Sequence, residues 1–164
     1  MKPDILNIVV AGIRWGKKWL LIKRNKGDYQ NKWALVGGKI EKNEELKEGI
    51  LREIAEETGL NVKWEGVKGT INERLIEEDK EGNIRHFIII VCQTSTEEGK
   101  LISTEEGELR WFTINDIDSR KEQIIPSDYY MITELLLKEK KSKAIEIEMI
   151  QSKEGLELTR ILEY

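Results

Sequence analysis

Several glutamates and an arginine are spaced along residues 44–58 in a way that could do chemistry. Successive residues of an α-helix lie about 100° apart, so Glu53, Glu56 and Glu57 would share one arc of a helix in this segment. The opposite arc would be apolar, with Ile50, Leu51, Ile54 and Ala55. Carboxylates three and four residues apart repel one another, and a cation among them would relieve that repulsion.

The oxygen-only ligand set predicts the identity of that cation. Carboxylates without nearby His or Cys suit Mg²⁺, with Mn²⁺ as a substitute, better than Zn²⁺. A metal acidifies a bound water, and repulsion between carboxylates keeps one of them basic enough to take a proton. The pattern therefore indicates metal-dependent hydrolysis. The alternative is a solvated acidic helix face in a chain that has 31 Asp and Glu.

The elements that must position these residues can be predicted from apolar periodicity. Strands are expected at residues 5–13, 19–22, 33–36, 62–75, 85–94 and 109–113. The strand at 33–36 should stop at Gly37 and Gly38. The clearest helix covers residues 44–58 and should end at Gly59. A second helix is expected from Ser127, as its N-cap, to about Lys140.

The length of 164 residues suits one domain with a hydrophobic core. The mixed order of strands and helices predicts an α+β or α/β/α layered arrangement, with residues 1–140 as its main part. Residues 141–164 alternate apolar and charged residues on both sides of a turn, which predicts a C-terminal β-hairpin extension of the same domain. Such a hairpin could pack on the domain or form a subunit contact, so a homodimer is one expected assembly.

Charge and apolar content narrow the class of partner. Lys and Arg number 27 against 31 Asp and Glu, a net charge of −4, which favours a small-molecule ligand over long nucleic acid or an anionic membrane. The longest apolar run, residues 87–92, is too short to cross a bilayer, and the first residues lack the layout of a signal peptide. A cytoplasmic location is expected. Cys92, the only cysteine, cannot form an internal disulfide.

The full spacing of the acidic segment resembles the signature of a known family. Gly38 is followed after five residues by Glu44, and after seven more by a run of Arg, Glu, apolar, any residue, Glu, Glu, any residue, Gly, apolar, from Arg52 to Leu60. This spacing matches the Nudix box at every fixed position, so the chain is identified as similar to the Nudix hydrolases. Gly37–Glu41 and the pair Arg85 and His86 resemble the MutT-like branch. Val36 departs from the proline that many relatives carry.

The resemblance implies a fold, a metal and an activity. The implied fold is the Nudix α/β/α sandwich with a mixed sheet. The implied metal ligands are the Gly37 carbonyl and the carboxylates of Glu53, Glu56 and Glu57. Glu53 is also expected to act in catalysis, Arg52 resembles the cation that orients the carboxylates, and Glu44 resembles a supporting acid.

The implied reaction is Mg²⁺-dependent cleavage of a phosphoanhydride bond in a nucleoside diphosphate-linked compound. A MutT-like nucleoside triphosphate pyrophosphohydrolase acting on oxidised or otherwise non-standard nucleotides is the leading hypothesis. An ADP-ribose or nucleoside diphosphate sugar pyrophosphatase is the alternative enzyme. A non-catalytic nucleotide-binding module of the same fold is the alternative of another class, although such modules commonly lose glutamates that are present here.

Contacts to the substrate are expected from basic residues outside the helix. Arg24, Lys39, Arg85 and His86 are the candidates, because arginine forks around phosphate oxygens and the only histidine opens a strand. The alternative is that they are ordinary strand-end charges and a structural histidine. Trp15, Trp19, Tyr29 and Phe87 could stack on a base, although aromatic residues in strands more often belong to the core.

One further acid is expected from the loop before the strand at 109–113. Glu105 is favoured over Glu106 and Glu108, because the extra acid of the MutT-like pattern lies several residues before the strand's tryptophan. The alternative is an acidic surface turn.

Overall fold

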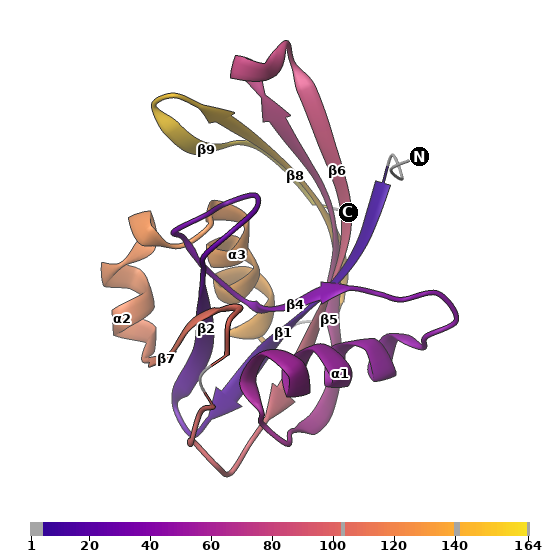
Figure 1. The fold of residues 1–164 in the computed structure, drawn as a ribbon, viewed down its shortest axis with the longest axis vertical. Coiled ribbons are helices and arrows are strands. Elements are labelled where there is room, and N and C mark those ends of the chain that lie inside the picture. Colours follow the sequence, from indigo (N-terminus) through magenta and orange to yellow (C-terminus); the bar gives the residue numbers. More distant parts are fainter. Residues whose placement is uncertain (1–4, 103, 140–141, 164) are drawn as a thin grey trace.

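The computed structural model describes residues 5–102, 104–139 and 142–163. Its strands are β1 (Ile5–Trp15), β2 (Lys18–Arg24), β3 (Trp33–Ala34), β4 (Val36–Lys39), β5 (Lys63–Glu77), β6 (Asn83–Ser95), β7 (Gly107–Phe112), β8 (Lys143–Ser152) and β9 (Gly155–Glu163). Its helices are α1 (Leu46–Thr58), α2 (Ile114–Ser119) and α3 (Pro126–Met131), with short helical turns η1 (Glu78–Lys80), η2 (Lys121–Gln123) and η3 (Ile132–Leu136). Figure 1 shows their arrangement.

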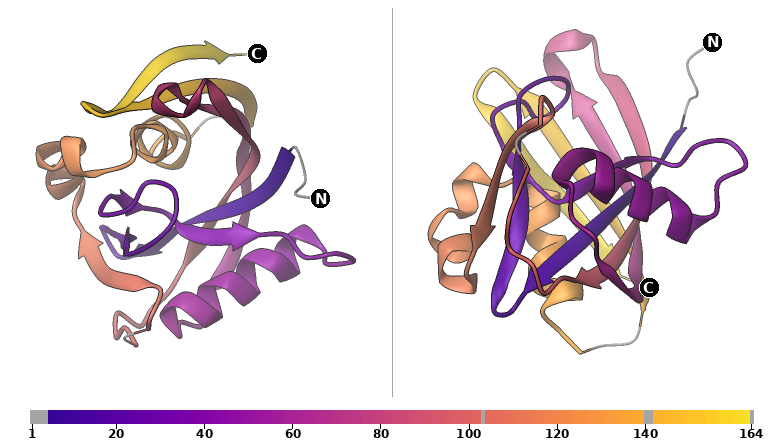
Figure 2. Two further views of the ribbon diagram at one scale, coloured as in Figure 1. Left: turned by 45° about the horizontal axis from the view of Figure 1, so that its top comes forward. Right: turned by 60° about the horizontal axis from the view of Figure 1, so that its bottom comes forward.

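The strands form one mixed, curled sheet with helices on both faces. The order is β3-β2-β1-β6-β5-β8-β9, with β4 pairing to β1 and β7 pairing to β2. β1 runs parallel to β6, and β5 runs parallel to β8. Figure 2 shows α3 inside the curl of the sheet and α1 on the other side of β1 and β4. This is the predicted α/β sandwich.

Helix α1 forms as predicted at its C-terminal end and begins two residues later than expected. Gly59 follows it with φ 69°, the left-handed conformation that glycine adopts at least cost. Glu45 is the extended N-cap residue, and its amide donates to the carboxylate of Glu48. Ile50 and Ile54 are fully buried, so the apolar arc packs on the sheet and the acidic arc stays outside it.

The predicted stop at the two glycines is wrong. Gly37 and Gly38 lie inside β4 and pair with Val10 and Val9 of β1. A side chain at Gly37 would place its Cβ 2.1 Å from the Val9 carbonyl oxygen. The absence of side chains therefore lets β4 lie against β1.

The predicted second helix differs in both its start and its regularity. Ile125 is the N-cap and Pro126 the first helical residue, a position that proline favours because its φ is preset. Ser127, the predicted cap, is buried inside the helix instead. After α3 the chain continues as the π-helical turn η3, and the predicted end at Lys140 lies outside the described residues. Helix α2, capped by Thr113, was not predicted.

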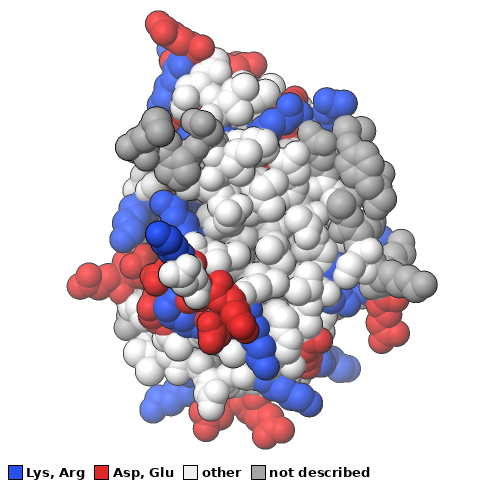
Figure 3. Space-filling view, turned by 90° about the vertical axis from the view of Figure 1, so that its right-hand side faces the viewer, with Lys and Arg blue, Asp and Glu red and all other residues white. Residues whose placement is uncertain are grey.

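The C-terminal hairpin has the predicted form. β8 and β9 are antiparallel and extend the sheet beyond β5. Ile145, Ile147 and Met149 of β8 are buried. Within the described residues, no helix is long and apolar enough to cross a membrane. On the face in Figure 3, a broad uncharged area is bordered by charged side chains of both signs.

Candidate active site

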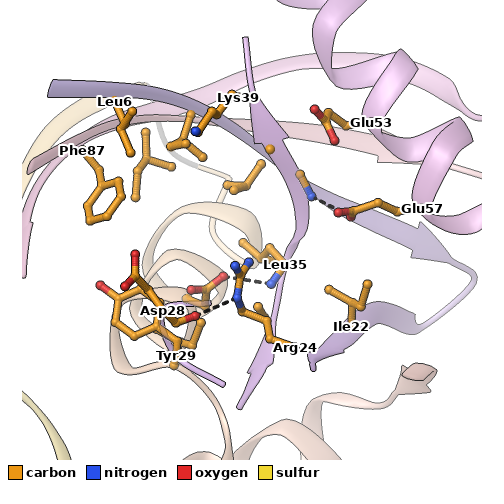
Figure 4. A pocket seen from close by; sticks show the side chains of 18 of the residues that line it. Leu6, Ile22, Arg24, Asp28, Tyr29, Leu35, Lys39, Glu53, Glu57 and Phe87 are labelled. Atoms are coloured by element: carbon orange, nitrogen blue, oxygen red, sulfur yellow. Dashed lines mark hydrogen bonds between the residues drawn. The ribbon is translucent and has the colours of Figure 1, made fainter. Parts of the chain in front are cut away.

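A cavity of about 300 Å³ lies between the acidic helix and α3. Glu53 and Glu57 line one end, and Arg24, Asp28 and Tyr29 line the other, as Figure 4 shows. Apolar side chains line the space between the two ends; they include Leu6, Ile8, Val10, Phe87, Ile89 and Met131. The cavity is therefore acidic at one end, apolar in the middle and polar at the far end.

Arg52 joins the acidic residues of α1 and the loop before it. Its Nε and Nη2 atoms donate to the two carboxylate oxygens of Glu44 at 2.7 and 2.9 Å, and Nη1 donates to Glu53 at 2.9 Å. This guanidinium lowers the pKa of Glu44 to about 2. Arg52 also donates to the Lys39 carbonyl, so it fixes the helix against β4. These bonds hold the carboxylates of Glu44 and Glu53 in fixed positions relative to each other.

The two carboxyl groups at the acidic end of the cavity, those of Glu53 and Glu57, have pKa values above the ordinary value for glutamate. Burial raises the pKa of Glu57 to about 7, and the charges of Glu53 and Glu106 add to the effect. The Gly37 amide, 3.2 Å away, opposes it by donating to Glu57. Burial also raises the pKa of Glu53, against the lowering effect of Arg52. Glu57 can therefore take up a proton near neutral pH.

Gly38 makes room for one of these carboxylates. A Cβ atom at this position would lie 2.6 Å from each carboxylate atom of Glu53. Any side chain here would displace Glu53 from the wall of the cavity. The spacing of Gly38 and Glu53 in the sequence thus corresponds to a direct contact between β4 and α1.

The donor set at the acidic end of the cavity fits a hard divalent cation. No three acidic, histidine or cysteine side chains among the described residues converge as a metal cage. Glu56 is 61% exposed, bonds Arg52 and does not line the cavity. Glu53, Glu57 and the nearby backbone of Gly37 offer only oxygen ligands, as Mg²⁺ prefers. A cation beside them would also relieve the repulsion that raises the pKa of Glu57.

The structure brings Glu106 rather than Glu105 to the cavity. Glu106 lines the cavity, and its carboxylate lies 3.5 Å from the Lys26 ammonium. Its negative charge contributes to the raised pKa of Glu57. Glu105 is not among the lining residues, and its carbonyl accepts a hydrogen bond from Asn25. Glu108 forms an exposed ion pair with Arg110. Sequence spacing could not resolve this choice, because it depends on how β7 pairs with β2.

Arg24 and Arg85, two of the predicted substrate contacts, line the far end of the cavity. Both are tied to Asp28: Arg85 forms an ion pair with its carboxylate at 3.2 Å, and Arg24 donates to its carbonyl at 2.9 Å. Lys39, a third predicted contact, is exposed at the acidic end. These three cations can attract a phosphorylated ligand.

His86, the fourth predicted contact, does not line the cavity. Arg85 and Phe87 line the cavity, and alternate residues of a strand point to opposite faces of the sheet. His86 is therefore turned to the outer face, where its Nε2 pairs with the Asn72 side chain of the neighbouring strand. His86 is kept out of the cavity because side chains of a strand alternate between the two faces of the sheet.

Two buried acids at the far end were missed from the sequence. Asp128 of α3 accepts a hydrogen bond from the Leu35 amide at 2.8 Å, and burial raises its pKa to about 7. Glu73 of β5 accepts from the Tyr29 hydroxyl at 2.6 Å. Glu73 occupies an inward position in phase with Ile71 and Leu75, and a polar residue in a buried row was the available signal.

The curled sheet, the acidic helix and the glycine-bearing strand β4 define the class of a Nudix-fold protein. The NUDIX domain model matches residues 5–135. This chain belongs to the Nudix family.

Individual comparisons agree with this assignment. The chain is 34% identical over 101 residues to an ADP-ribose pyrophosphatase of Methanocaldococcus jannaschii, covering 61% of this chain and 57% of that protein. It is 30% identical over 88 residues to an uncharacterized Nudix hydrolase, YvcI, of Bacillus subtilis, covering 53% of this chain and 54% of the relative. The chain thus spans little more than half the length of these relatives.

A solved structure shares the fold. The mutator MutT protein from Bacillus halodurans superposes with a TM-score of 0.71 at 20% identity, over 96% of this chain and 97% of that one.

Proposed function

We propose that this chain is a Mg²⁺-dependent, MutT-like nucleoside triphosphate pyrophosphohydrolase that acts on normal or oxidised nucleotides. The observation that carries the proposal is the division of one cavity into an acidic end, an apolar middle and a polar far end. Phosphates belong at the acidic end, where Lys39 also lies. The base belongs between the apolar walls. A volume of about 300 Å³ is small for a ligand pocket and suits one nucleoside.

Each residue at the acidic end of the cavity has a separate role in the proposed reaction. Glu53 and Glu57, with the Gly37 carbonyl and Glu56 as further ligands, would hold Mg²⁺, which supplies positive charge and a more acidic water when bound. Arg52 keeps Glu53 in place through their 2.9 Å hydrogen bond. Glu106 lies outside the helix as an additional proton acceptor, and Lys39 balances part of the charge of the phosphates.

Hydrolysis of ADP-ribose is the second candidate, because the relative from Methanocaldococcus jannaschii carries that name. The volume of about 300 Å³ argues for a triphosphate over a compound that carries a second ribose. In either case we propose a cytoplasmic enzyme. The open edge of β9 offers main-chain groups for pairing with a second copy, so the proposal includes a homodimer.

The test is a substrate panel with products separated. Nucleoside triphosphates, their oxidised forms, ADP-ribose and nucleotide sugars are incubated with Mg²⁺ or with a chelator. Pyrophosphate and a nucleoside monophosphate are expected from the triphosphates. Release of AMP and ribose phosphate from ADP-ribose alone would select the second candidate. No hydrolysis of any compound with Mg²⁺ or Mn²⁺ would instead support a nucleotide-binding module.

Variants connect any activity to the proposed site. Glu53→Gln and Glu57→Gln should each lower turnover at least about a hundredfold, because each removes a charge that the metal or a proton needs. Glu78→Gln, in the exposed turn η1, is the matched control and should keep wild-type turnover. Near-normal turnover of both site variants at saturating Mg²⁺ would contradict the assignment.

A further inference from the structure

Glu73 is a buried carboxyl group that the proposed hydrolysis does not use. It is 1% exposed, on the inward face of β5, and lines the far end of the cavity. Its Oε1 atom accepts the Tyr29 hydroxyl, whereas Oε2 has no hydrogen-bond partner among the described residues. A buried polar atom left without a partner is unfavourable. The fold therefore keeps an acceptor that a ligand can satisfy.

The neighbouring groups do not satisfy this oxygen. Burial raises the pKa of Glu73, and the nearby hydroxyls of Ser127 and Tyr29 oppose that rise. The Ser127 hydroxyl nevertheless does not meet Oε2 at hydrogen-bonding geometry. Asp28 is paired with Arg85, and Asp128 accepts from the Leu35 amide. Among these carboxyl groups, Oε2 of Glu73 is the buried oxygen for which the described residues supply no hydrogen bond.

The loop before β3 holds the carboxyl group of Glu73 in this arrangement. Tyr29 has φ 63°, a left-handed conformation that is uncommon for a residue with a side chain. This conformation accompanies a tyrosine side chain that lines the cavity and donates to Glu73 at 2.6 Å. One oxygen of Glu73 is therefore fixed, which sets the direction of the other.

We infer that Glu73 makes the far end of the cavity select nucleobases with an amino group over analogues with a carbonyl oxygen at the same position. This inference rests on the proposed function as a nucleotide hydrolase. An amino group can donate a hydrogen bond to Oε2, and that bond favours the ionised carboxylate. A carbonyl oxygen would face another acceptor and leave both without a donor. Sites built to pair a polar group reject analogues that lack it.

Matched nucleotide pairs test the inference on the full chain. CTP and UTP differ in an amino and a carbonyl group on the pyrimidine, and ATP and ITP differ in the same way on the purine. We expect kcat/KM to favour CTP over UTP and ATP over ITP by at least about tenfold, the equivalent of one ordinary hydrogen bond. Glu73→Gln should lower both ratios at least about tenfold, because its amide can present a donor where Oε2 was.

A control on the same strand separates this effect from general damage to β5. Glu77 is also inward-facing and 4% exposed, but it pairs with Lys80 and Asn83 and does not line the cavity. Glu77→Gln should keep both wild-type ratios. Wild-type ratios near one would overturn the inference even if Glu73→Gln did not fold. Ratios that Glu73→Gln leaves unchanged would overturn it as well.

Binding measurements separate failure of this inference from failure of the proposed function. α,β-Methylene analogues of the four nucleotides are titrated by calorimetry, which needs no turnover. Tighter binding of the amino-bearing analogues without any hydrolysis would keep the base selection and reject the hydrolase. Hydrolysis together with equal binding of both members of each pair would keep the hydrolase and reject the base selection.

Discussion

Replacing Asp128 with asparagine should stabilise the protein at alkaline pH relative to acidic pH. Asp128 is 7% exposed, and its carboxylate accepts the Leu35 amide. Asparagine has nearly the same shape and can keep that bond through its carbonyl oxygen. The substitution therefore removes the ionisation of a buried group while it preserves the contact between α3 and the chain before β4.

The size of the effect follows from the pKa of Asp128, which burial raises from 3.8 to about 7, with a further rise from the charge of Glu73. The folded protein then holds this proton more tightly than the unfolded chain. Stability from this group is complete below pH 3.8, falls as the pH rises, and is lost above pH 7. At 1.36 kcal/mol for each pH unit, the loss is about 4 kcal/mol.

Urea unfolding at pH 4 and pH 8 measures this loss. Between the two pH values, the free energy of unfolding of the variant should rise relative to the wild type by about 4 kcal/mol. For a chain of this length, this corresponds to roughly 10 °C in Tm. Asp118→Asn, at an exposed position of α2, is the control and should leave the pH dependence unchanged. Parallel curves for the wild type and Asp128→Asn would refute the reasoning.

Two further predictions separate residues that the structure places differently from the sequence. Glu106→Gln should lower kcat at least about tenfold and Glu105→Gln should not, because of the two only Glu106 lines the cavity. Equal effects of the two substitutions on kcat in steady-state assays would show that this loop has no part in catalysis. Arg85→Ala should raise KM for the nucleotide at least about fivefold, while His86→Ala on the outer face should leave KM unchanged. A larger change in KM for His86→Ala would contradict the strand assignment.

Local patterns in the sequence determined the framework of the acidic end. The apolar and acidic arcs of α1 follow from the 3.6-residue period, and the end of the helix follows from the conformational freedom of Gly59. The spacing of Gly38, Glu44, Arg52 and Glu53 encodes contacts that the fold realises directly. These features involve one helix, the loop before it and the adjoining strand β4, so their geometry is set within one short stretch of the chain.

Only the tertiary structure decided which residues share the cavity with that helix. Glu106 reaches it because β7 pairs with β2, and Glu73 and Asp128 meet there because the sheet curls around α3. His86 is excluded because one step along a strand reverses the face. These outcomes depend on pairing between segments that are far apart in the chain. No local period records such pairing, since its free energy comes from burial and hydrogen bonds that form only in the assembled sheet.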